Sequence, residues 1–257
     1  MNWEFALASE IGSREKQQDR IAVFTSHDGA SSLAVLADGL GGHSDGGEAA
    51  QYLLDVAERR FQSHGSNNPE ELLRSICDDC HHGLKIQENT TGELSATTCV
   101  MLLLNGDEAH WAHVGDSRLY HFRNQEMVFR TRDHALSDLS EYEMDSLGLD
   151  QDSQASRGQV FMCLGGSNSI DPELGLTAID QDDWFMLCSD GVWSAYDEKE
   201  LVRITVDSDH DIPDASRFVQ KAVEKLGDQA DNSSIIFARP GEIEAEQGLF
   251  SRLFAWG

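Results

Sequence analysis

The stretch that decides the fold is Leu33-Ala34-Val35-Leu36-Ala37-Asp38-Gly39-Leu40-Gly41-Gly42-His43. Its first five residues form a continuous apolar run with the length and composition of a buried strand. An aspartate follows at once, and the glycines after it give the chain a flexible turn. We therefore expect a carboxylate where a buried strand ends and a loop leaves the sheet.

The same arrangement recurs three times along the chain. Further aspartates flank strand-like stretches, namely Asp116 after 109–114, Asp190 after 184–188 and Asp231 before 234–237. Carboxylates that gather at one site repel each other unless cations lie between them. The four aspartates together predict a shared metal site and a metal-dependent hydrolase, although any one of them alone is as well explained by a turn or a helix cap.

Composition limits the possible functions. The chain has 257 residues, is 40% hydrophobic and carries a formal net charge of -27, which argues against binding to nucleic acid. The longest aliphatic run, 100–104, is too short to cross a membrane, and the first residues lack the pattern of a signal peptide. We expect a soluble cytoplasmic protein, in which the five cysteines are free thiols. A zinc site at Cys77, Cys80, His81 and His82 is the alternative, but it lacks a second ligand pair.

Hydrophobic periodicity predicts an α+β layered domain. Alternating or continuous apolar stretches predict strands at 5–9, 20–26, 33–37, 97–104, 109–114, 118–122, 174–178, 184–188 and 234–238. Helical spacing predicts helices at 47–61, 69–86, 197–206 and 214–226. Strands joined by short turns, with two pairs of helices inserted, favour this class over a parallel doubly wound sheet.

The order of the motifs resembles the PPM family of metal-dependent serine/threonine phosphatases (type 2C), in its compact bacterial form. The resemblance covers about residues 12–238. It rests on Arg14 and Asp19, then DGLGGH (38–43), SATTCVMLLL (95–104), GDSRLY (115–120), RDHALSD (132–138), CSDGVW (188–193) and DNSSIIF (231–237).

The resemblance implies a fold and an activity. The fold would be a four-layer α-β-β-α sandwich of two antiparallel sheets flanked by helix pairs, with residues 1–240 as the catalytic domain and 241–257 as a tail. A mobile flap would span about 136–171. The activity would be hydrolysis of phosphoserine and phosphothreonine on proteins by a hydroxide that bridges two divalent metals. The expected partners are phosphorylated proteins, including a serine/threonine kinase or its substrates, and the expected state is a monomer.

The resemblance also assigns the site residues. Two Mn²⁺ or Mg²⁺ ions would be held by Asp38, the backbone carbonyl of Gly39, Asp190 and Asp231, with Asp38 bridging the two ions. Asp19 would orient a metal-bound water, unless it is an ordinary surface acid. A third, weaker ion would bind Asp116 and Asp190; the alternative for Asp116 is a tight turn of a hairpin.

Arg14 is the expected phosphate ligand, because a guanidinium can bind two phosphate oxygens at once. The family usually has Asn where this chain has Gln17, which leaves the geometry of that loop open. His43 is a candidate general acid, with a structural role in the glycine loop as the alternative. His134, like His110, His113 and His121, is expected to be structural.

Three other functions fit the sequence less well. A phosphatase with an aspartyl nucleophile needs a second Asp two residues after the first, and position 40 is Leu. A nucleotide-binding glycine loop needs a spacing that residues 39–47 do not have. A catalytically silent PPM-like binding module remains the alternative from another class, although such modules typically lose the metal-binding aspartates that this chain keeps.

The tail beyond Pro240 carries Leu249, Phe250, Leu253, Phe254 and Trp256 at helical spacing. A helix folded back on its own domain and a docking peptide for a partner both fit this pattern.

Overall fold

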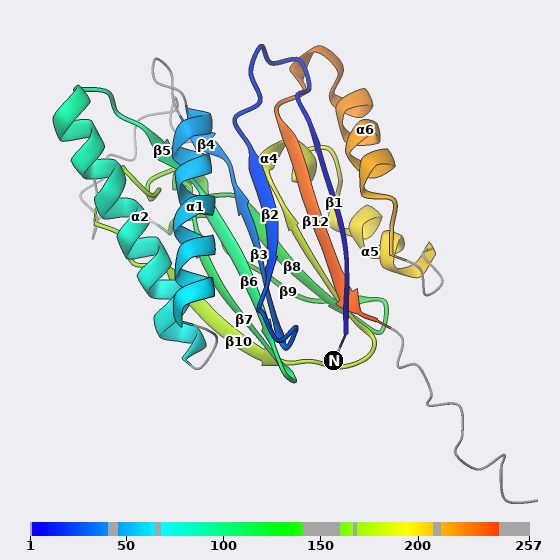
Figure 1. Cartoon of the computed structure of the whole chain (residues 1–257). Helices are drawn as coiled ribbons and strands as arrows, with labels where there is room; N and C mark the ends of the chain where they lie inside the picture. Colours follow the sequence, from blue (N-terminus) through cyan, green and yellow to red (C-terminus); the bar gives the residue numbers. More distant parts are fainter. Residues whose placement is uncertain are drawn as a thin grey trace, which may run out of the picture.

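Two antiparallel five-stranded sheets lie face to face, with helices on both outer faces (Figure 1). This arrangement comes from a computed structural model that describes residues 2–40, 46–64, 68–140, 160–166, 169–207 and 212–241. The α+β class and the four-layer α-β-β-α sandwich predicted from the sequence are confirmed. Among the described residues, no helix has both the length and the apolar character that crossing a membrane requires.

The first sheet contains both ends of the described chain. Its strands, in spatial order, are β1 (Trp3–Glu10), β12 (Ser233–Pro240), β11 (Asp183–Cys188), β8 (Arg118–Arg123) and β9 (Glu126–Arg130). β1 and β12 pair along their whole length, from Trp3 opposite Pro240 to Glu10 opposite Ser233. The two ends of the described chain are thus hydrogen-bonded to one another.

The second sheet contains the strand that opens the sequence argument. Its order is β10 (Glu173–Ala178), β7 (Glu108–Val114), β6 (Cys99–Asn105), β3 (Ser31–Ala37) and β2 (Arg20–Thr25). Beyond the ends of β3 and β6, a short pair is formed by β4 (Gly39–Leu40) and β5 (Ala96–Thr97).

One helix pair covers each sheet. α1 (Gly46–His64) and α2 (Pro69–Thr91) lie on the second sheet, and α6 (Ala215–Leu226), preceded by α5 (Glu198–Asp207), lies on the first. α2 begins with a proline in its first turn and Asn68 as its N-cap, and it ends at Gly92 in the left-handed conformation. These are the expected start and stop signals of a helix.

The burial of β3 explains its continuous apolar sequence. Leu33 and Val35 pack against α1 and α2, whereas Ala34 and Leu36 point into the space between the two sheets. Because both faces of the strand are covered, alternation with polar residues would place a polar side chain in a core. The strand therefore has a rigid end, from which Asp38 emerges.

The structure corrects the predicted elements in two places. β9 was missed, because Asn124 and Gln125 form its hairpin turn with positive φ angles and lack the usual glycine. The predicted strand at 97–104 is divided at Thr98, whose backbone N–H bonds to the carbonyl of Asp38 and leaves the ladder of β6.

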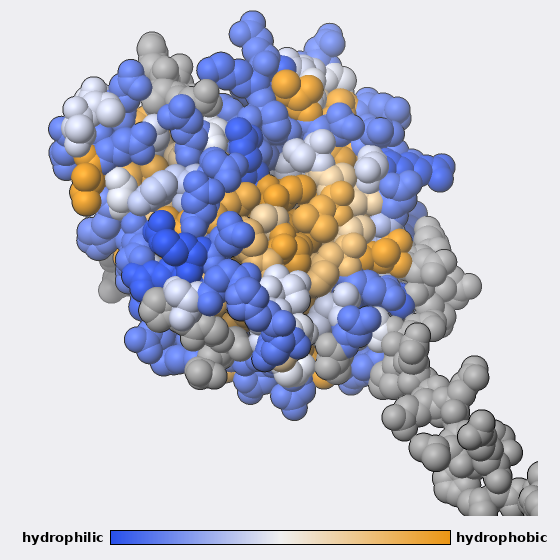
Figure 2. Space-filling model, in the orientation of Figure 1, coloured by the Kyte–Doolittle hydropathy of each residue, from blue (hydrophilic) through white to orange (hydrophobic). Residues whose placement is uncertain are grey.

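The edge strands β1 and β2 lie on the same side of the sandwich, where the core between the sheets reaches the surface. Figure 2 shows an apolar area at the centre of this face. Leu7 on β1 is 38% exposed, and Ile21 and Val23 on β2 are half-buried.

Candidate metal centre

Five aspartates converge at one end of the sandwich, the upper end in Figure 1, where β3, β11 and the loop after β1 meet. Burial and the repulsion of the other four aspartates raise the pKa of Asp38 well above its ordinary value; these four are Asp19, Asp190, Asp116 and Asp231. Burial, followed by repulsion from Asp116, raises the pKa of Asp190 to about 7. The predicted grouping of these side chains is therefore what the fold produces.

Asp19 is the most deeply buried of the five, with 2% of its surface exposed. One carboxylate oxygen, Oδ2, accepts a hydrogen bond of 2.8 Å from the Ser189 hydroxyl, which in turn accepts one of 2.9 Å from the Ser234 backbone N–H. The other oxygen, Oδ1, has no hydrogen-bond partner. Burial is the main cause that raises the Asp19 pKa to about 6. The alternative of an ordinary surface acid is excluded.

Two threonines fix the backbone of Asp38. The Thr98 hydroxyl accepts a hydrogen bond of 3.0 Å from the Asp38 backbone N–H, and the Thr97 hydroxyl donates one of 3.0 Å to the Asp38 carbonyl. The next residue, Gly39, lies so close to Gly46 that an added Cβ would meet the Gly46 carbonyl oxygen at 2.1 Å. Position 39 must therefore be glycine, because the first residue of α1 packs directly against it.

The turn that carries Asp116 connects the two sheets, because β7 belongs to one and β8 to the other. The predicted alternative of a hairpin is therefore wrong. The indole Nε1 of Trp193 donates a hydrogen bond of 2.9 Å to the Asp116 carbonyl oxygen. The Arg118 guanidinium stacks on this indole, with its Cζ 3.6 Å from the ring centroid. It is held by two hydrogen bonds to Asp133, from Nε to Oδ1 at 2.8 Å and from Nη2 to Oδ2 at 2.6 Å. Backbone and side-chain contacts thus hold the turn in place.

Asp190 begins the short helix α4 (Asp190–Trp193) instead of a turn. The same helix delivers Trp193, so one element positions both Asp190 and the indole that holds Asp116. Gly191 permits this geometry, because an added Cβ would lie 2.2 Å from the Asn232 carbonyl oxygen.

Arg14 and Asp231 meet at the open side of the site. The Arg14 guanidinium, whose side chain is 60% exposed, donates a hydrogen bond to a carboxylate oxygen of Asp231. The loop that carries Arg14 is held by Asn232, whose amide donates to the carbonyls of Ile11 and Lys16, at 2.9 and 3.0 Å. The predicted phosphate ligand is thus a charged group at the rim of the acidic cluster.

The unusual Gln17 has a definite place in this loop. Its amide oxygen accepts a hydrogen bond of 2.9 Å from the Asp19 backbone N–H, and its amide nitrogen donates to the Glu10 carbonyl at 3.0 Å and to the Ser9 hydroxyl at 2.8 Å. The longer side chain therefore ties Asp19 to the end of β1.

Several predictions lie partly or wholly outside the described residues. His43, most of the flap, including residues 141–159, and the tail from residue 242 belong to this group. Within the flap region, the described segment 160–166 returns to the core, where Leu164 pairs with Thr97. The zinc alternative at Cys77 and Cys80 is not supported, because both thiols are buried in the apolar core beside α1.

Four uncharged residues that hold the aspartates were not predicted to have a role at the site, namely Thr97, Thr98, Trp193 and Asn232. All four lie inside the motifs that carry the family resemblance, so the motifs could have pointed to them. What they contact depends on the packing of distant strands.

The donor set fits divalent cations. Oxygen ligands only, several carboxylates and a buried carboxylate oxygen of Asp19 without a partner are the features that hard ions such as Mg²⁺ and Mn²⁺ require. Asp19, Asp38, Asp116, Asp190 and Asp231 would hold such ions.

The fold has many solved counterparts. A serine/threonine phosphatase from S. agalactiae superposes with a TM-score of 0.79 at 22% identity, over 93% of this chain and 100% of that chain. The catalytic domain of the phosphatase PstP, in complex with two manganese ions, gives a TM-score of 0.72 at 21% identity, over 92% of this chain and 97% of its own. The chain thus has the α-β-β-α sandwich fold of these phosphatase structures.

The particular family follows from the sequence. The family model for protein phosphatase 2C matches residues 8–230, so the chain belongs to this family. The protein phosphatase PhpP of Streptococcus pneumoniae is 25% identical over 255 residues, which cover 95% of this chain and 100% of PhpP. The resemblance seen in the motifs is thereby confirmed, and the protein is an enzyme, a metal-dependent protein phosphatase.

The raised pKa values predict how the metal-free protein responds to pH. An unfolded Asp loses its proton near pH 4, whereas Asp19 and Asp190 in the fold keep theirs until about pH 6 and about pH 7. The folded state therefore binds more protons within this window, and its stability falls as the pH rises through it. We expect Mn²⁺ to raise the melting temperature more at about pH 7.5 than at about pH 5, because bound cations offset the repulsion.

Thermal melts with chelator and with Mn²⁺ at both pH values measure this difference. The Asp190→Asn variant is the control, since it removes one repelling charge and should flatten the pH dependence of the chelated protein. An equal rise in melting temperature with Mn²⁺ at both pH values would contradict the assignment of the pH dependence to these carboxylates.

Proposed function

We propose that this phosphatase hydrolyses phosphoserine and phosphothreonine on proteins with a hydroxide nucleophile held between two divalent cations, and so reverses a serine/threonine kinase. The observation that carries the proposal is the convergence of five carboxylates around an unpartnered oxygen of Asp19, with Arg14 at the rim. The names of relatives, such as the serine/threonine phosphatase from S. agalactiae, support the substrate class.

The cations would be Mn²⁺ or Mg²⁺, and when bound they supply a water of lowered pKa and neutralise phosphate charge. Asp38 has the most central position, since it interacts electrostatically with all four other carboxylates, and we assign it the bridging role. Asp190, Asp231 and the Gly39 carbonyl would complete the two coordination shells. Asp19 would orient a water, because its Oδ1 is free to accept a hydrogen bond.

Arg14 would bind the substrate phosphate. Its guanidinium is exposed and forms an ion pair with Asp231. When Asp231 shares its charge with a cation, the guanidinium can turn its paired N–H groups to two phosphate oxygens. We retain His43 as a candidate general acid in this scheme.

The expected setting follows from the same chemistry. We propose that the substrates are phosphorylated proteins, among them a serine/threonine kinase or its substrates, and that the enzyme acts as a monomer. A cytoplasmic location is supported by the five free cysteines. A catalytically silent binding module is the second candidate, and the retained carboxylates count against it.

The central test is metal dependence. Phosphopeptide hydrolysis should require added Mn²⁺ or Mg²⁺ and stop with chelator, and Asp190→Asn should lower kcat by roughly two orders of magnitude or more. Asp182→Asn, which changes an exposed aspartate eight residues upstream, is the matched control and should leave the rate unchanged. Undiminished turnover in metal-free enzyme would exclude the mechanism, and no turnover under any metal condition would favour the silent module.

Arg14 can be separated from the metal ligands. We expect Arg14→Ala to raise KM for a phosphopeptide and lower kcat/KM by about tenfold to a hundredfold, while calorimetric Mn²⁺ affinity stays nearly unchanged. Arg14→Lys should restore only part of the loss, since a point charge cannot make the paired contact. A loss of Mn²⁺ affinity equal to the loss of activity would show that Arg14 supports the site structurally through Asp231.

Asp116 is proposed to bind a third, weaker cation together with Asp190. Its carboxyl pKa is raised by burial and by repulsion from Asp133, so a cation nearby would be stabilising. We expect Asp116→Ala to keep both tight Mn²⁺ sites in calorimetry and to lower the rate on phosphopeptides by about tenfold or more. Full activity over a range of metal concentrations would reduce Asp116 to a connector between the sheets.

A further inference from the structure

His113 is a buried polar side chain whose ion-pair partner, Glu173, lies with its nearest oxygen at 3.6 Å, beyond ordinary hydrogen-bond distance. It lies on β7, is 0% exposed, and neither Nδ1 nor Nε2 has a hydrogen-bond partner. Its neighbours Ala112 and Val114 pack on the helix-covered face of the sheet, so the imidazole points to the opposite face, between the sheets. A buried polar group that lacks a hydrogen bond destabilises the fold, so such groups call for an explanation.

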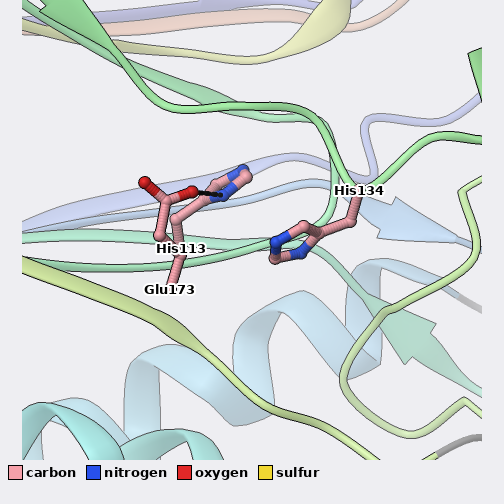
Figure 3. Close-up of side chains that lie close together, drawn as sticks. All are labelled: His113, His134 and Glu173. Atoms are coloured by element: carbon pink, nitrogen blue, oxygen red, sulfur yellow. Dashed lines mark ion pairs between the residues drawn. The ribbon is translucent and has the colours of Figure 1, made fainter. Parts of the chain in front are cut away.

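Two further side chains with ligand atoms converge on His113 (Figure 3). Glu173 on β10 is its direct partner in the antiparallel register, and its Oε2 lies 3.6 Å from His113 Nδ1. His134 comes from the segment after β9, and its ring centroid is 4.7 Å from that of His113. One ligand atom from each of the three residues lies within 4.8 Å of the other two.

We propose that His113, His134 and Glu173 bind a transition-metal ion, best represented by Zn²⁺, at a site distinct from the five aspartates. Two imidazoles and one carboxylate suit Zn²⁺, whereas Mg²⁺ and Mn²⁺ prefer oxygen ligands alone. In a tetrahedral site with bonds of about 2.1 Å, the ligand atoms lie about 3.4 Å apart, so the three side chains need only a small contraction. Glu173 is 39% exposed and provides the entry from solvent.

The site is coupled to the turn that carries Asp116. The Gly115 backbone N–H donates a hydrogen bond of 3.1 Å to the ring nitrogen His134 Nδ1, and the His134 backbone N–H donates one of 2.8 Å to the Gly115 carbonyl. Because Nδ1 accepts, the neutral ring carries its proton on Nε2. A neutral imidazole has one nitrogen lone pair, so a metal ion bound to either nitrogen of His134 removes the acceptor that Gly115 uses. Zn²⁺ therefore loosens the Asp116 turn.

The proposal is tested by metal titration of the full chain. The Asp38→Asn/Asp190→Asn double variant removes competition from the acidic site, and calorimetry then counts Zn²⁺ sites. We expect one site, whose affinity falls by at least about tenfold in His113→Gln and in Glu173→Gln. His27→Gln, which changes an exposed histidine in the turn after β2, is the matched control and should bind Zn²⁺ unchanged. Co²⁺ in place of Zn²⁺ should give visible absorption bands that the His113→Gln variant loses.

A second measurement needs no substitution at the new site. In nitrogen-15 NMR spectra of the same double variant, Zn²⁺ should shift the ring nitrogens of His113 and His134, and the Gly115 amide proton should move upfield as its hydrogen bond is lost. Unchanged ring signals at saturating Zn²⁺, or equal Zn²⁺ affinity with and without His113, would overturn the proposal and leave His113 and Glu173 as an ion pair. Neither readout depends on phosphatase activity, so the result is independent of the proposed function.

Discussion

Repulsion among five partly or fully buried carboxylates is the constraint to which the rest of the site responds. Each aspartate in the cluster would be more stable apart from the others, and the fold holds them together through neutral hydrogen bonds. The Ser189 hydroxyl holds Asp19, the Thr98 hydroxyl holds the Asp38 backbone, and the Trp193 indole holds that of Asp116. None of these contacts neutralises charge. As the pH rises through about 6 to 7, Asp19 and Asp190 lose their protons, and the negative charge then becomes available to cations at a preorganised site.

The sandwich can hold the repelling carboxylates together because its central strands are packed on both faces. β3 is buried on one side by α1 and α2 and on the other by the opposing sheet, so its end cannot retreat from the other carboxylates. β1 and β12 pair along eight residues, which fixes the loop of Arg14 and Asp19 against Asp231. Interior packing is rigid enough to hold strain of this kind.

The Asp116 turn contributes to the fold, to the acidic cluster and to the position of His134. It links the sheets, carries the carboxylate proposed for the weaker cation, and is bonded to His134. His134 also accepts a hydrogen bond of 2.8 Å, at its carbonyl, from Phe161 on the return segment of the flap region. A ligand that changes the position of His134 is thereby connected to both the acidic site and this segment.

The sequence by itself determined the fold class, the positions of the main strands and helices, and the identity of the five aspartates. Apolar runs that end in Asp-Gly specify a buried strand and a turn locally, and the order of the motifs specified the family. The tertiary structure alone decided what each aspartate contacts. The role of Gln17, the orphaned Oδ1 of Asp19 and the approach of His113 to His134 depend on strands that are distant in sequence. Periodicity reports which face of an element is buried, but not which side chain from another element lies opposite it.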